Sequence, residues 1–312
     1  MSQTDSSFKR FSISNLLTIL VISALYLLLS SILIGFKMEQ LVLVAIFCIL
    51  YFASSVSRKF ILGFSIFIVY WIVFDYMKAF PNYKFNNVHI GDLYLFEKHL
   101  FGIKYGNTIL TPNEFWLQNQ KPFLDVISGF FYLCWVPVPL LFAVYLFFKN
   151  REEFLKFSLT FLWVNILGFI IYYIYPAAPP WYIQHFGNIF HSHTSGSDAG
   201  LQRFDDMFHV KIFQSLYAQS SNVFAAMPSL HSAYPVILLY YGLRNKLGMI
   251  NIIFALIMAG IWFSAVYNSH HYVIDILAGL GCAIIAIISF NWFLKNVKWA
   301  DNVLKKYIKV LE

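Results

Sequence analysis

The stretch HYVIDILAGLGCAIIAIISFNWFL, residues 271–294, decides the fold class. It has no charged residue after Asp275, and a helix needs about 20 predominantly apolar residues to cross the hydrocarbon core of a bilayer. An ionisable residue inside such a segment is costly, so His271 and Asp275 are candidate functional groups by default. The stretch therefore predicts a transmembrane helix with chemistry at its first turn.

Seven other apolar segments accompany this one, and the chain as a whole is 59% hydrophobic and only 12% charged. That composition excludes an ordinary soluble domain. The eight predicted spans cover residues 16–36, 40–56, 60–79, 124–148, 154–175, 229–243, 249–267 and 271–294. The second and sixth are short for a span. We expect an all-α polytopic membrane protein with about eight transmembrane helices.

Two long connections, 80–122 and 176–228, divide this pattern. Long loops in a compact bundle are often functional. We expect four parts: N-terminal transmembrane helices 1–79, an extracytoplasmic interfacial segment 80–123, a catalytic core 124–295 that includes outer loop 176–228, and a basic tail 296–312. Within the second part, Leu93, Phe96 and Leu100 have the spacing of an interfacial amphipathic helix, although the pattern fits a solvated loop helix equally well.

The charge pattern predicts the orientation in the membrane. Fourteen lysines and arginines of the short loops and tails fall on one side of the predicted spans, and only Lys37 falls on the other. The positive-inside rule then places both termini in the cytoplasm and both long connections on the extracytoplasmic side. The net charge of +7 is accounted for in this way, without a nucleic-acid partner.

His231 stands at the start of a predicted helix, in the stretch AMPSLHS at residues 226–232. Pro228 is typical of a first helical turn. The N-terminus of a helix offers unpaired N–H groups and a positive dipole, which together bind phosphate oxygens. The position of His231 therefore favours phosphate chemistry near the membrane surface.

His271 and Asp275 are four residues apart, which would place them on one helix face and within hydrogen-bonding reach. A carboxylate bonded to one imidazole nitrogen leaves the other free as a nucleophile. The charge pattern places His231 at the same membrane face, so we expect these three side chains to converge. A packing or interfacial role is the plainer interpretation for His270.

The pairing of PSLHS at 228–232 with HHYVID at 270–275 resembles the second and third signatures of the type-2 phosphatidic acid phosphatase superfamily. The resemblance implies a six-helix phosphatase or phosphotransferase core. It also implies that His271 attacks phosphorus, Asp275 supports it and His231 protonates the leaving group.

The chain departs from those signatures at several positions, and these departures narrow the class of enzyme that we expect. No arginine is followed by proline, Ala265 stands where the third signature has an arginine, and Leu230 replaces a glycine. The stretch YPAAPPWY at 175–182 resembles the proline-rich signature of the inositol phosphorylceramide synthase branch, including its bacterial relatives. Over residues 80–295 the resemblance implies transfer of a phosphorylated headgroup, most simply phosphoinositol, from a glycerophospholipid to a lipid alcohol such as ceramide. It implies a phosphohistidine intermediate, no metal and no cofactor.

With the customary arginines absent, other groups must stabilise the charge on the phosphate. We expect Arg203, then Lys211, and N–H groups around Ser229 to do so, with Trp181 and Tyr182 gripping a lipid or sugar. Two alternatives stay open: a lipid phosphate phosphatase using the same site, and a non-catalytic lipid transporter or binding subunit. The histidines of loop 176–228 lack metal-ligand spacing and fit a solvated loop.

Overall fold

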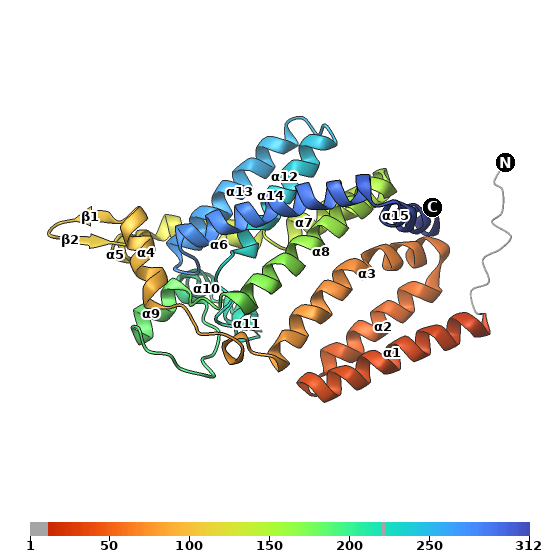
Figure 1. Ribbon diagram of the computed structural model, residues 1–312, viewed down its shortest axis with the longest axis horizontal. Helices are drawn as coiled ribbons and strands as arrows, with labels where there is room; N and C mark the ends of the chain where they lie inside the picture. Colours follow the sequence, from red (N-terminus) through yellow and green to blue (C-terminus); the bar gives the residue numbers. More distant parts are fainter. Residues whose placement is uncertain (1–11, 220–221) are drawn as a thin grey trace.

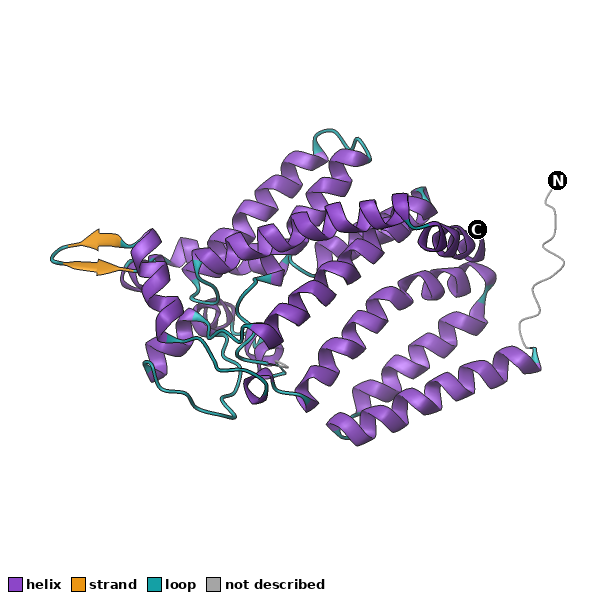
Figure 2. Ribbon diagram, in the orientation of Figure 1, coloured by secondary structure: helices purple, strands orange, loops and turns teal. Residues whose placement is uncertain are grey.

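The computed structural model describes residues 12–219 and 222–312, and this part of the chain is predominantly helical (Figure 2). The longer helices are α1 (Ile13–Ile34), α2 (Met38–Ala53), α3 (Ser55–Tyr76), α4 (Gly91–Phe101), α6 (Pro122–Leu133), α7 (Pro137–Lys149), α8 (Arg151–Ile174), α12 (Leu230–Arg244), α13 (Ile250–Tyr267), α14 (Val273–Asn296) and α15 (Lys298–Leu311). Short helices are η1 (Met77–Ala79), η2 (Asn82–Lys84), α5 (Pro112–Gln118), α9 (Pro180–Phe186), η3 (Ala199–Leu201), α10 (Gln202–Phe208) and α11 (Ile212–Ala218). Strands β1 (Ile103–Tyr105) and β2 (Thr108–Leu110) form an antiparallel hairpin.

Each predicted span is helical, and the all-α polytopic membrane fold is confirmed. Among the described residues, six helical segments are long and apolar enough to cross a membrane, whereas α2 and α12 are shorter. A count of eight spans therefore stays a prediction. The span predicted at 124–148 is two helices, α6 and α7, separated by a turn at residues 134–136. Pro137 begins α7, because a proline has no N–H to donate to the preceding turn.

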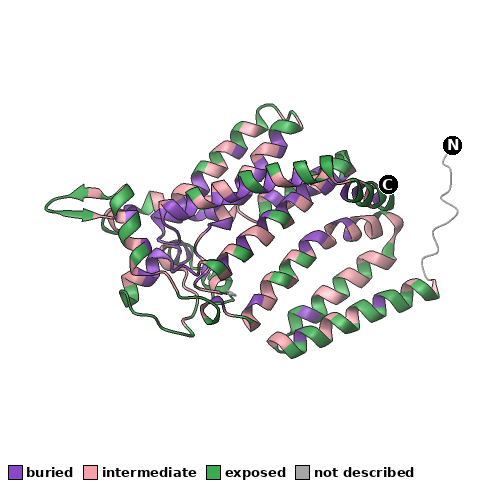
Figure 3. Ribbon diagram, viewed as in Figure 1, coloured by how far each residue is buried: buried purple, intermediate pink, exposed green. Residues whose placement is uncertain are grey.

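The N-terminal helices form a layer beside the main bundle (Figure 1). Helices α1 and α2 pack on α3, and α3 packs on α8 of the bundle. Figure 3 shows burial concentrated in the bundle and the outer connections, while α1 is mostly exposed. An exposed apolar helix suits contact with lipid rather than water.

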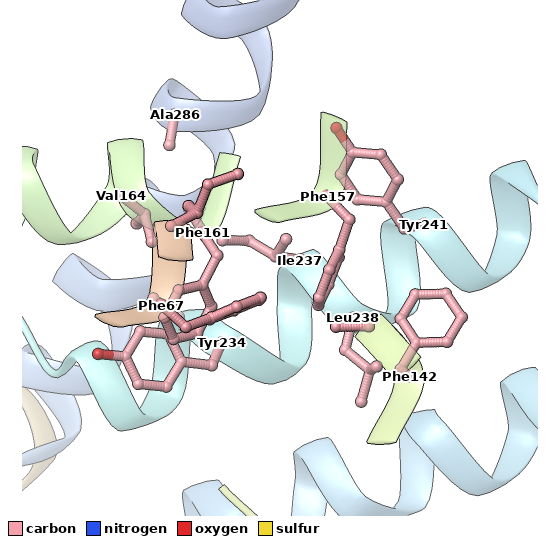
Figure 4. Close-up of a cluster of buried hydrophobic side chains, with 14 of the residues drawn as sticks. Phe67, Phe142, Phe157, Phe161, Val164, Tyr234, Ile237, Leu238, Tyr241 and Ala286 are labelled. Carbon is pink, nitrogen blue, oxygen red and sulfur yellow. The ribbon is translucent and has the colours of Figure 1, made fainter. Parts of the chain in front are cut away.

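Helix α12 lies at the centre of the bundle and packs on α8, α13 and α14. Its Tyr234, Ile237, Leu238 and Tyr241 are buried against residues such as Phe161 (Figure 4). The tyrosine hydroxyls also have partners: Tyr234 donates to Asn165 Oδ1 at 2.6 Å, and the Tyr241 hydroxyl lies 2.8 Å from that of Thr160. Pairing matters because an unpaired polar group in a low-dielectric core costs free energy.

Backbone hydrogen bonds join the two long connections, 80–122 and 176–228, near the C-terminal end of α8 and the N-terminal end of α12. His89 donates to Pro176 O at 2.8 Å, and Ala177 donates to Phe224 O at 2.9 Å. The three segments around residues 89, 177 and 225 therefore lie side by side as isolated parallel bridges. This ladder holds the two long connections over the end of the bundle.

The residues through which α4 packs on the rest of the protein are not the predicted apolar face of Leu93, Phe96 and Leu100 as a whole. Leu93 and Glu97 are its buried residues, whereas Phe96 and Leu100 are about half exposed. Glu97 is buried because its carboxylate caps another helix, a contact that the spacing of apolar residues does not encode.

The basic C-terminal segment is an amphipathic helix, α15, rather than a simple tail. Ala300, Leu304 and Leu311 are buried, and the helix packs on α3, α8 and α14. Lys59 Nζ donates to the carbonyl of Glu312, which joins the α2–α3 corner to the chain end. Figure 1 shows α15 at the opposite end of the molecule from the β hairpin.

Candidate active site

His231 is positioned by the turn that begins α12. Ser229 is the N-cap, and its side chain accepts from Ser232 N. Ser229 N donates in turn to Asp275 O at 2.9 Å, so the α12 turn is fastened to the first turn of α14. Gly279 allows this approach, since a Cβ there would lie 2.2 Å from Ser229 O.

His271 is positioned by a short turn between α13 and α14. Its N–H donates to Ala265 O at 3.0 Å. The buried Asn113 of α5 donates to both His271 O, at 2.9 Å, and Val266 O, at 2.8 Å. A side chain from the long connection 80–122 thus fixes the backbone that carries the predicted nucleophile.

The three predicted catalytic side chains lie close together as expected, but the predicted hydrogen bond between His271 and Asp275 is not formed. His231 Nδ1 lies 3.3 Å from His271 Nε2, and His271 Nδ1 lies 3.6 Å from Asp275 Oδ2. The expected common helix face is wrong, however, because His271 precedes α14 and Tyr272 is the N-cap of that helix. The capping turn brings His271 back over the first turn, where Asp275 Oδ2 also accepts from Tyr272 N at 2.8 Å.

Burial sets the protonation of the two adjacent histidines. Desolvation lowers the pKa of His271 to about 4, and it lowers the pKa of His270 well below its ordinary value. Both imidazoles are therefore neutral near pH 7. A neutral imidazole has the lone pair that nucleophilic attack requires.

Aromatic side chains enclose the histidines. The Tyr132 hydroxyl lies 3.2 Å from His231 Nδ1 and accepts from the Tyr217 hydroxyl at 3.2 Å. Trp135 contacts His231 edge-on, with ring centroids 4.3 Å apart. His270 stacks on Tyr217 at 4.4 Å between centroids and on Tyr132 at 5.4 Å. Sequence reasoning missed these aromatic residues, because no spacing distinguishes them from the other aromatic residues of the chain.

Glu97 is a further residue that the sequence did not indicate. Its carboxylate is fully buried and accepts from Val273 N at 3.0 Å and Ile274 N at 3.1 Å. Burial raises the pKa of Glu97 to about 7. The first N–H groups of α14 are thus satisfied by a carboxylate from α4, two residues from His271.

Arg203 lies in an ion pair outside the histidine cluster. Its Nε donates to Asp125 Oδ1 at 2.6 Å, and its Nη2 donates to Asn268 Oδ1 at 3.3 Å. The Tyr267 hydroxyl donates to the same Asp125 oxygen at 2.8 Å. Asp125 is therefore a buried ion-pair partner of Arg203. To bind phosphate, Arg203 would have to donate to it while also holding its hydrogen bonds to Asp125 and Asn268.

The other predicted binding residues lie at varied positions. Trp181 is buried in α9 and lines the cavity described below, whereas Tyr182 is buried with its hydroxyl donating to Ile189 O at 3.1 Å. Ser229 is buried and occupied in capping, and Lys211 is exposed at the start of α11. Their binding roles stay predictions.

A cavity of about 770 Å³ lies beside the histidines and is lined by His231, His270 and His271. Its walls are largely apolar and aromatic, and they come from the bundle, from loop 176–228 and from α2 and α3. The volume falls in the range of small-molecule binding sites. A reacting group on His271 would therefore lie at the wall of a partly open, mostly apolar cavity.

Fold and site define a class: a polytopic, all-helical membrane protein with a histidine pair and a carboxylate at a largely apolar cavity. Residues 107–289 match the family model of the PAP2 superfamily. The chain belongs to that superfamily, and the resemblance seen in the two histidine motifs is confirmed.

Similar proteins share one activity in their names. The chain is 43% identical to the phosphoinositol dihydroceramide synthase of Bacteroides thetaiotaomicron, over 95% of this chain and 98% of that protein. It is 28% identical to the inositol phosphorylceramide synthase of Candida albicans, over 56% of this chain and 40% of that protein. It is 32% identical to the catalytic subunit of the Saccharomyces cerevisiae enzyme, over 38% of this chain and 29% of that protein. No solved structure matches the chain.

Proposed function

We propose that this protein transfers phosphoinositol from a glycerophospholipid to a ceramide-type lipid alcohol. The carrying observation is the 3.3 Å approach of His231 to His271 at the edge of the cavity, with Asp275 behind His271. The similarity to a phosphoinositol dihydroceramide synthase along nearly the whole chain supports the choice of headgroup and acceptor. We propose that this reaction needs no cofactor.

In the first step, His271 Nε2 forms a bond to phosphorus while the bond from phosphorus to the glycerol oxygen breaks. His231, whose charged form is stabilised by the phosphate anion bound beside it, gives its proton to that oxygen, and diacylglycerol leaves. In the second step, His231 takes the proton from the acceptor hydroxyl. The acceptor oxygen then bonds to phosphorus, the N–P bond breaks, and both histidines return to their starting states.

Asp275 supports His271 from the Nδ1 side, where a carboxylate stabilises the positive charge that the imidazole acquires during attack. The phosphate needs donors as well. Because Glu97 already accepts from the first N–H groups of α14, the N-terminal turn of α12 is the better remaining anion site. Arg203 and Lys211 remain further candidates for this charge.

We propose the orientation and the four-part division given by the sequence. The histidines lie at one end of the bundle, and the α2–α3 corner with Lys59 contacts the chain end at Glu312. The positive-inside rule puts that basic corner and both termini in the cytoplasm and the histidines on the extracytoplasmic side.

The test is lipid mass spectrometry on purified protein in vesicles that contain labelled phosphatidylinositol and ceramide. We expect inositol phosphorylceramide and diacylglycerol in equal amounts from the wild type. His271→Ala should reduce transfer by about 10³-fold or more, because no side chain remains to form the covalent intermediate. The exposed His99→Ala in α4 is the matched control and should transfer normally.

Full activity of folded His271→Ala would exclude this mechanism. The same vesicles separate the alternatives: release of inositol phosphate irrespective of ceramide indicates hydrolysis. Lipid movement without covalent turnover, unchanged in His231→Ala, indicates a transporter.

A further inference from the structure

The cavity beside the histidines is completed by helices outside the family match. The match begins at residue 107, yet the cavity is lined by Val42, Leu43 and Ile46 of α2 and by Trp71 and Phe74 of α3. Any ligand that fills the cavity therefore contacts a layer that the common core of the family does not supply.

The α2–α3 wall changes from polar to apolar along its length. Lys37 of the α1–α2 turn, Gln40 in the first turn of α2 and Lys78 of η1 line the cavity. Ile46 lies eight residues beyond Met38, which is ~12 Å along the axis of α2. Val42 and Ile46 are each about half exposed although they line the cavity. The wall thus has polar side chains near the α1–α2 turn and apolar side chains farther along α2, the polarity of a lipid molecule.

The chemistry of two successive displacements places both lipids at one position, and this step rests on the proposed function. His231 gives a proton to the leaving glycerol oxygen and later takes one from the attacking hydroxyl. The two oxygens must therefore occupy the same place beside His231 in turn. The hydrocarbon chains attached near them then need the same apolar space.

We propose that the cavity wall formed by α2 and α3 binds the hydrocarbon chain of the lipid whose oxygen lies at His231, first the phospholipid donor and then the acceptor. Residues at the apolar end of this wall select for chain length. Val42 and Ile46 of α2 and Trp71 of α3 are the residues that carry this selection.

The test fills the apolar end of the wall. Ile46→Trp is compared with Ile49→Trp, a residue of the same helix that is 65% exposed and outside the cavity lining. Transfer is measured with long-chain and short-chain ceramides. We expect Ile46→Trp to lower the ratio of long-chain to short-chain kcat/KM by about tenfold or more, and Ile49→Trp to leave that ratio unchanged. An equal effect of Ile46→Trp on both chain lengths overturns the proposal.

A binding measurement separates this inference from the proposed function. Phosphatidylinositol and ceramide, each with a photoreactive group at the end of one acyl chain, are crosslinked in separate arms and mapped by mass spectrometry. Labelling of α2 and α3 by both lipids, with mutual competition and loss in Ile46→Trp, supports the shared site even if the wild type transfers nothing. Labelling by only one lipid, or only outside α2 and α3, overturns it.

Discussion

At the scale of single residues, the first turn of α14 is held by two carboxylates with different tasks. Asp275 Oδ2 accepts from Tyr272 N and faces His271, whereas Glu97 accepts from Val273 N and Ile274 N. Because Glu97 satisfies the end of the helix, the turn that carries His271 has little freedom to move. Glu97 is thus a positioning residue for His271.

Glu97→Ala should reduce kcat by about 10-fold or more with little change in KM. The substitution leaves two buried N–H groups without an acceptor, a cost of about 1–3 kcal/mol each, and loosens the turn. Glu97→Gln keeps one acceptor oxygen and should recover part of the rate. Steady-state kinetics in vesicles checks this, with exposed Glu152→Ala as the control. A change confined to KM would contradict a positioning role.

The acid side of the pH profile should lie unusually low. Burial lowers the pKa of His271 to about 4, so the neutral nucleophile persists as pH falls below the ordinary value near 6.5. The unfolded chain takes up this proton first, so thermal stability should fall as pH drops from about 6.5 to about 4. Comparing kcat/KM as a function of pH between the wild type and Glu97→Gln distinguishes the titration of His271 from any step near pH 7 that Glu97 causes. A nucleophile titrating near 6.5 would refute the assignment.

At the scale of elements, the contact between α12 and α14 brings the histidines together, and one glycine permits it. Gly279 faces Ser229 O, which is backbone and cannot rotate away. Gly281 lies on the same helix with nothing within 4 Å of an added Cβ. The two positions therefore distinguish helix propensity from close packing.

Gly279→Ala should lower both the melting temperature and transfer, because an added Cβ would force α12 away and separate His231 from His271. Gly281→Ala should raise stability by about 0.5–1 kcal/mol, the usual gain for this substitution in a helix. Thermal unfolding followed by circular dichroism and the vesicle assay measure both. Equal behaviour of the two variants would show that this approach does not position the site.

At the scale of the whole molecule, the position of the basic corner predicts the sidedness of the enzyme. In a cysteine-free background, Ser192→Cys lies in loop 176–228 and Asn302→Cys lies in α15, and both native side chains are exposed. A membrane-impermeant maleimide should label Ser192→Cys on intact cells and Asn302→Cys only after permeabilisation, as the positive-inside rule requires. The reverse pattern would invert the orientation.

The sequence by itself determined the helices and the residues that meet. Apolar run length is a local property, so all eight segments could be located, and the spacing of PSLHS and HHYVID identified His231, His271 and Asp275. The break at Pro137 was missed because apolar composition continues across it.

Only the tertiary structure decided which side chains surround those three. Glu97 reaches α14 across 176 residues of chain, and Arg203 reaches Asp125 across 78. Tyr132 reaches His231 in the same way, and residues of α2 line the same cavity as the histidines. Such contacts depend on how helices pack, and packing leaves no periodic signal in one sequence. The catalytic residues can therefore be recognised from short stretches of sequence. The residues that position them and the walls of the cavity are brought together only by the fold.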